Sequence, residues 1–219
     1  YIEKLVISPS AVDTGATYMT NLDRKLNEAS TGVSSAYNSG TNQTTFTIPY
    51  TVDNTMEVVT RNVSGSSTVA GEVIPTVSQT GTSIVVAGDK TATKLFIGEK
   101  YTFSYTFSKQ YLRRDSGSGG AVAITEGRLQ IRTFNINYSD TGYFQAVVTP
   151  EARDSSTYTF TGAIVGNAVV NGVNLTDGSY KFTIASQNEG LSIVLQSDKH
   201  LPCIFSSAEW EGLFYKRAS

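Results

Sequence analysis

Apolar and polar side chains alternate with a period of two along most of this chain. In the segment 100–108, aromatic rings at positions 101, 103, 105 and 107 alternate with Thr and Ser. Such alternation places the rings on one face of a β-strand. The segment 128–138 has the same pattern, but its apolar positions change from odd to even numbers after Ile131. We therefore predict a strand there with a β-bulge near Thr133.

Many other short segments alternate in the same way and are separated by Gly, Asn and Asp. Helical periodicity is poor: 22–29 is a weak helix candidate, and a short helical turn is possible near 208–215. This pattern predicts a mainly β protein with antiparallel sheets, arranged as a sandwich or a barrel-like fold, and very little helix. The other expected strands are 3–7, 17–23, 43–48, 56–61, 82–87, 143–149, 156–161, 179–185, 190–196 and 202–207.

Two loop-like segments indicate how the chain is organised. Arg114–Gly120 is rich in Gly and Ser and has almost nothing to bury, and Asn62–Ser67 is similar. We expect a main β region made of 1–61 and 99–219, which can divide into two packed subdomains. We expect 62–98 to form a small inserted β subdomain.

The composition excludes several classes of protein. Of the 219 residues, only 16% are charged, the formal net charge is −2, and there is one cysteine. No internal disulfide can form, and Cys203 between Pro202 and Ile204 is interpreted as a small buried hydrophobe. A sequence-reading nucleic-acid domain would show a basic patch. No apolar run approaches the roughly 18 residues that a membrane helix needs.

Two Asp-Thr-Gly triplets resemble the paired motifs of aspartic proteases, whose two carboxylates share a proton. They are Asp13–Gly15 and Asp140–Gly142, and a bulky Tyr143 follows the second. We interpret both as turns in which Asp caps and Gly takes a positive φ. The second triplet lies between two strong strands, so we predict a hairpin turn there.

His200 is the only histidine. One histidine excludes a site with several His ligands and leaves little for a Ser-His-Asp triad. His200 precedes Pro202 and follows an apolar strand, so we interpret it as part of a turn. We expect no metal site and no cofactor.

Glu209 and Glu211 flank Trp210 and are the best candidates for the paired carboxylates of a glycosidase. In a strand, a spacing of two directs both carboxylates to one face and Trp210 to the other. Glutamates beside an aromatic ring also bind sugars, so all three residues are candidate glycan contacts. A strand with Trp inward and Glu outward explains the pattern equally well.

An ordered set of short motifs covers nearly the whole chain and resembles one family. Together they are similar to the C-terminal part of the tail nozzle (tail tubular protein B) family of short-tailed bacteriophages. The most specific block is Ser206-Ser-Ala-Glu-Trp-Glu-Gly212. The other motifs are Leu22–Lys25, Thr44–Tyr50, Tyr101–Arg113, Glu126–Arg132, Asn137–Phe144, Val147–Pro150, Tyr158–Gly162 and Ser197–Pro202.

The resemblance implies a structural role in the virion tail. Nozzle proteins form a ring, typically a hexamer, below the portal and the adaptor (tail tubular protein A), near the tail fibres. The ring opens or closes the channel through which the genome leaves, so DNA passes transiently and without sequence specificity. The family pattern contains no catalytic residues. This chain stops at 216–219, where relatives continue with more arginines, so it is expected to be a fragment that need not form the ring alone.

Four arginines are the exceptions in a chain with few charges. They are Arg113, Arg114, Arg128 and Arg132. Arg128 and Arg132 have even spacing and are expected to share a strand face. We interpret the four as candidate subunit contacts or lumen residues, because a cyclic ring repeats each residue around its axis. Solvated or paired surface charge is the simpler explanation.

Three function classes follow in order. The first is a non-enzymatic tail protein that works by assembly and conformational change. The second is a carbohydrate-binding β-sandwich adhesin that contacts the host surface. The third is a polysaccharide hydrolase with Glu209 and Glu211 as its acids. A glycan array distinguishes the second from the first, and a zymogram tests the third.

Overall fold

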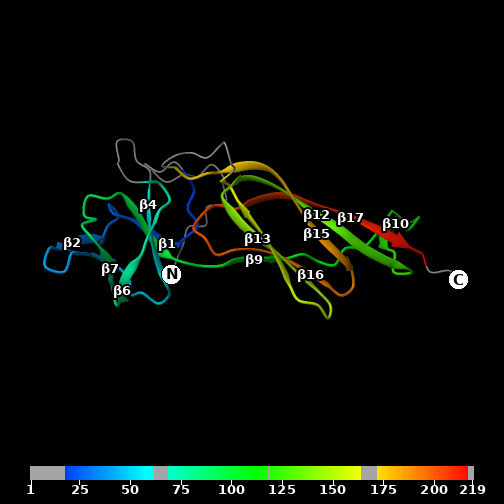
Figure 1. Ribbon diagram of the computed structural model, residues 1–219, viewed down its shortest axis with the longest axis horizontal. Coiled ribbons are helices and arrows are strands. Elements are labelled where there is room, and N and C mark those ends of the chain that lie inside the picture. Colours follow the sequence, from blue (N-terminus) through cyan, green and yellow to red (C-terminus); the bar gives the residue numbers. More distant parts are fainter. Residues whose placement is uncertain (1–17, 62–68, 118, 164–171, 217–219) are drawn as a thin grey trace. The chain divides into compact units, whose positions relative to one another are not determined.

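The computed structural model describes residues 18–61, 69–117, 119–163 and 172–216. Within these ranges the chain forms strands β1 to β17 and no helix (Figure 1). All strand pairs are antiparallel, which confirms the predicted mainly β fold. No helix of the described part could cross a membrane. The chain divides into two compact units: unit 1 is 1–102, 163–174 and 198–202, and unit 2 is 103–162, 175–197 and 203–219.

Unit 1 contains two four-stranded sheets, with orders β1-β8-β4-β5 and β2-β3-β7-β6. Their facing side chains form one core, to which Phe46, Val58, Ile84 and Ile97 contribute from four different strands. All four are at most 1% exposed, as inward positions of a sandwich require. The strands are β1 (Asp23–Asn27), β2 (Ser34–Asn38), β3 (Gln43–Thr47), β4 (Met56–Thr60), β5 (Val73–Ile74), β6 (Thr76–Thr80), β7 (Ser83–Ala87) and β8 (Leu95–Glu99).

The segment 62–98 supplies β5, β6, β7 and most of β8 to these two sheets. β7 pairs with β3, and β8 lies between β1 and β4, so the strands of this segment share sheets with strands outside it. Asn62–Ser67, the expected loop, lies outside the described residues. The division of the chain into a main region and an inserted subdomain stays a prediction.

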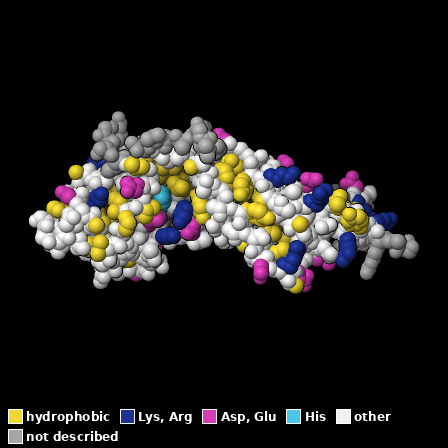
Figure 2. Space-filling view, in the orientation of Figure 1, with side chains coloured by type: hydrophobic (Ala, Val, Ile, Leu, Met, Phe, Trp, Pro, Cys, Tyr) yellow, Lys and Arg dark blue, Asp and Glu magenta, His cyan; other side chains and the backbone are white. Residues whose placement is uncertain are grey.

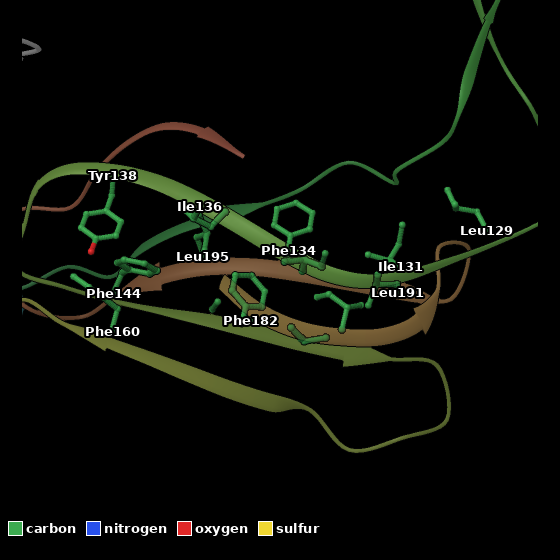
Figure 3. Packing of buried hydrophobic residues seen from close by; sticks show 14 residues of the cluster. Leu129, Ile131, Phe134, Ile136, Tyr138, Phe144, Phe160, Phe182, Leu191 and Leu195 are labelled. Carbon is green, nitrogen blue, oxygen red and sulfur yellow. The ribbon is translucent and has the colours of Figure 1, made fainter. Parts of the chain in front are cut away.

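Unit 2 contains a three-stranded sheet, β15-β12-β17, and a four-stranded sheet, β14-β13-β16-β9. Aromatic and aliphatic side chains of both sheets meet in its core, including Phe134, Phe144, Phe182 and Leu195 (Figure 3). A separate hairpin is formed by β10 and β11. The strands are β9 (Phe103–Thr106), β10 (Arg113–Asp115), β11 (Ala121–Ala123), β12 (Arg128–Thr141), β13 (Tyr143–Pro150), β14 (Ser156–Thr161), β15 (Thr176–Gln187), β16 (Leu191–Ser197) and β17 (Ile204–Tyr215).

The predicted β-bulge is present in β12. The register shifts between Ile131 and Thr133 in the pairing with β15 and in the pairing with β17. Ile131 is buried before the shift and Phe134 is buried after it. The extra residue keeps apolar side chains on the core face although their numbering changes phase.

Both helical candidates are wrong. The segment 22–29 contains strand β1, and 208–215 belongs to β17, which pairs with β12 along nearly its whole length. Within β17, Trp210 and Phe214 pack against the core while Glu209 and Glu211 are exposed. The ladder with a central strand therefore determines the structure of a segment whose apolar pattern is weak.

The predicted hairpin turn at Asp140–Gly142 is also wrong. β12 and β13 belong to different sheets, so the chain crosses between layers at this point. The residue with positive φ is Asp140, at 44°, a conformation that Asp tolerates better than most residues. Its N–H donates to Asp177 Oδ1 at 2.7 Å, which anchors the crossing. The other triplet, Asp13–Gly15, lies outside the described residues.

Candidate functional surface

The outer face of the sheet β15-β12-β17 brings together four of the seven residues selected from the sequence. Arg128 and Arg132 are exposed on β12 at positions that alternate with buried ones, so they share this face. Glu209 and Glu211 are exposed on the adjacent strand β17. The four charged side chains share one face of the sheet only because β12 and β17, far apart in sequence, are neighbouring strands.

Uncharged polar groups fill most of this outer face. Asn137 Nδ2 donates to Ser207 Oγ at 2.8 Å, and Thr133 Oγ1 donates to Glu211 Oε2 at 3.3 Å. Lys181 on β15 forms an ion pair with Glu211 at 3.4 Å, with both side chains 61% exposed. An ion pair this exposed contributes at most about 1 kcal/mol to stability. In Figure 2, charges of both signs are scattered among uncharged polar and hydrophobic side chains of the visible face.

Trp210 lies on the opposite side of β17 from the two glutamates. Its ring is partly buried and packs against the core of unit 2, with Phe134 as its partner residue on β12. The arrangement matches the interpretation with Trp inward and Glu outward. Glu209 and Glu211 are both exposed on the outer face of the sheet, whereas glycosidase carboxylates face each other across the sugar. A glycan contact at these residues stays a prediction.

Arg113 and Arg114 lie on β10, in the hairpin with β11, and both are exposed. Ser116 N–H donates to Gly120 O at 2.8 Å, which closes the Gly-rich loop as a tight turn. The structure therefore places this arginine pair in a different sheet from Arg128 and Arg132.

Sequence reasoning missed a hollow near the start of β12. Its volume is about 540 Å³, and its lining includes Arg128, Glu151, Arg153 and Tyr215. Arg153 Nη2 donates to Ala185 O at 3.2 Å, which holds the loop after β13 against β15. Because the complete lining comes from four separate segments of the chain, only the strand pairing could have shown the hollow.

Unit 1 contains a buried histidine with a shifted pKa. His200 is 4% exposed, and its Nδ1 lies 3.8 Å from Glu57 Oε2. The ring of Tyr18 packs edge-on against it, with centroids 6.5 Å apart. Burial lowers the pKa of His200 to about 4 and raises the pKa of Glu57. The expected turn at His200 gave no sign of this burial.

The depressed pKa of His200 predicts a loss of stability in acid. The unfolded chain takes up the proton near pH 6.5 and the folded chain only near pH 4, so the stabilisation is complete above pH 6.5 and is lost between these values. The shift corresponds to about 3 kcal/mol in the free energy of unfolding. Urea unfolding of the wild type and of His200→Gln at pH 7 and pH 4.5 measures it.

We expect the acid shift to cost the wild type roughly 2 to 3 kcal/mol more than His200→Gln. The raised pKa of Glu57 has the opposite sign, since it adds stability as the pH falls, but it acts in both proteins and cancels in the comparison. Equal losses in the two proteins would contradict the buried neutral imidazole.

The described residues contain no group of three or more His, Cys, Asp or Glu side chains that could hold a metal ion. Cys203 is partly buried, and burial raises the pKa of its thiol to about 11. A thiol with so high a pKa carries little thiolate and is a poor nucleophile near neutral pH.

Comparison with known proteins adds to this geometry. A family model described as "Bacteriophage nozzle protein" matches residues 1–219. The chain is also 27% identical over 136 residues to "Tail tubular protein gp12" of Escherichia phage T7. That alignment covers 61% of this chain and 17% of the phage T7 protein, so the chain spans about a sixth of the length of this relative.

Proposed function

The chain belongs to the bacteriophage nozzle protein family, and on this premise we propose that it builds part of the wall of the channel through which a phage genome leaves. Membership of this family places the chain among the structural proteins of the virion tail. The match of the family model to all 219 residues is the observation that carries the proposal.

The proposed assembly is a ring of identical subunits, a hexamer by the resemblance, that contacts the adaptor and the fibres of the tail. DNA would pass through it without being held. A low charge density suits such a wall, because each Lys or Arg contact to phosphate adds salt-dependent affinity. The chain as a whole fits this requirement, since only 16% of its residues are charged, and the charges on the outer face of β15-β12-β17 are of both signs.

The proposal includes no catalytic step. The best candidate acids, Glu209 and Glu211, lie exposed on one face of a strand, and Glu211 contacts Thr133 and Lys181. The adhesin alternative gains no specific support, since the Trp210 ring is partly buried against the core.

Electron microscopy of the full-length protein tests the ring directly, with closed rings as the expected result. Within the ring, we predict that Arg128 and Arg132 face a neighbouring subunit or the channel. Reversing both charges with Arg128→Glu and Arg132→Glu should then lower the yield of infectious particles by at least about tenfold, because every subunit repeats the change.

The matched control is Lys109→Glu, which reverses another exposed charge of unit 2. It should leave the particle yield unchanged. Normal assembly and normal DNA delivery by the double arginine variant would remove both arginines from the subunit contacts and the channel. Full-length protein without rings would contradict the proposal as a whole.

A further inference from the structure

Within the described residues, unit 2 has two unusually long strand edges that pair with no other strand. β15 and β17 are the outer strands of the three-stranded sheet, and each has 12 residues. The other edge strands of the described residues have two to six. A long edge exposes a row of backbone N–H and C=O groups, and proteins normally block such edges with short strands, proline or inward charges.

Neither β15 nor β17 contains a proline, and their charged residues are not buried. Arg153 occupies one carbonyl of β15, at Ala185, and within the described residues no strand pairs with the outer edge of either strand. The segments 177–184 of β15 and 205–213 of β17 therefore remain as two edges that fit an added strand.

We infer that β17 of one subunit pairs with β15 of the next, so that the three-stranded sheet continues from subunit to subunit around the ring. This inference rests on the proposed ring and identifies the surfaces that close it. The partner is a second copy of this chain.

The middle parts of the two edges carry opposite charges. β15 has Asp177 near its start and Lys181, its one cation, in its middle, and Glu209 and Glu211 are the only charged residues of β17. Within one subunit, the Lys181 side chain already reaches Glu211 across the whole width of β12. A glutamate on a directly adjacent strand, about 4.8 Å away, is well within its reach.

Strand direction also fits a ring. β15 and β17 both run antiparallel to β12, so they point the same way. Rotation about an axis roughly along the strands preserves that direction, and β17 would meet the neighbour's β15 in parallel. Such a contact joins two different surfaces of the subunit, and a closed assembly built from it is a ring. A twofold dimer would instead pair β17 with β17 of the other subunit, in antiparallel fashion.

Disulfide trapping in the full-length protein tests the seam. Ser207 and Ser179 lie in one row of the outer face with Asn137 between them. Two strand spacings, roughly 9.6 Å, separate them, too far for a disulfide within one subunit. If the strands run parallel to the ring axis, rotation about that axis brings Ser207 of one subunit opposite Ser179 of the next. If the strands are tilted against the axis, the pairing between the two subunits is shifted by an even number of residues.

Five double variants cover displacements of zero, two and four residues in either direction. Ser207→Cys is combined with Ser179→Cys, Lys181→Cys or Thr183→Cys, and Ser179→Cys is combined with Glu209→Cys or Glu211→Cys. The six single variants are the matched controls. Cys203 can be kept because of its raised thiol pKa, and other accessible cysteines of the full-length chain are removed. After mild oxidation, we expect one double variant to give a ladder of covalent multimers up to the size of the ring. The single variants should give no covalent multimers.

Three other outcomes would overturn the inference. Covalent dimers from Ser207→Cys alone would indicate a twofold β17–β17 contact. Rings seen by electron microscopy with no ladder in any double variant would remove this seam and leave the proposed function intact. Wild-type protein that forms no rings would remove both.

Discussion

Replacing Phe144 with alanine should lower the free energy of unfolding of unit 2 by about 3 to 5 kcal/mol. Phe144 is fully buried. Its ring packs against four aromatic side chains at centroid distances of 4.9 to 6.0 Å: Tyr138, Phe160, Tyr180 and Phe205. The cost is large because β12, β14, β15 and β17 all lose a packing partner at once and the cavity cannot easily collapse.

Trp210, the only tryptophan, lies in unit 2, so its fluorescence during urea unfolding follows this unit alone. The matched control is Tyr105→Ala, at a ring that is 53% exposed on β9, where we expect a loss below about 1 kcal/mol. Equal losses in the two variants would mean that the aromatic cluster is not the core of this unit.

Breaking the buried Arg24–Glu99 ion pair of unit 1 should cost nearly as much. Arg24 Nη1 lies 2.7 Å from Glu99 Oε1, and Glu99 is 7% exposed. The guanidinium also stacks on the Tyr50 ring, 3.7 Å from its centroid. Glu99→Leu removes the nearest buried carboxylate from the Arg24 cation, so we expect a loss of about 3 to 5 kcal/mol, measured by urea unfolding followed by circular dichroism.

Two further variants isolate the electrostatic part of the stability lost in Glu99→Leu. Combining Arg24→Met with Glu99→Leu should recover most of the loss, because no buried charge is then left behind. Glu211→Leu breaks the exposed pair with Lys181 and should change stability by less than about 1 kcal/mol. A double variant as unstable as Glu99→Leu alone would indicate that packing, and not the charge, is responsible.

Local alternation was sufficient to predict much of the fold. The phase change after Ile131 predicted the bulge in β12, because burial on one face fixes the parity of every apolar position. The crossing at Asp140 escaped prediction, since a change of sheet and a hairpin turn use the same Asp and Gly residues. The strand nature of 208–215 was also hidden, because half of its outer positions are apolar.

The candidate surface was predictable only in part. Even spacing correctly predicted that Glu209 and Glu211 share a face opposite Trp210. Their proximity to Lys181 depends on the order of strands in the sheet, and period-two patterns carry no information about that order. The burial of His200 depends likewise on contacts with Tyr18 and Glu57, which are distant in sequence.

The interleaved division of the chain has a consequence for synthesis. Residues 198–202 belong to unit 1, although most of unit 2 precedes them in the chain. The backbone N–H of Asn21 donates to the carbonyl of His200 at 2.7 Å. This contact near the start of the described chain therefore forms only after His200 has been synthesised. The ribosome must therefore have translated the chain as far as His200 before unit 1 can be completed. By then most of unit 2 has also been synthesised, so the two units fold together rather than one after the other.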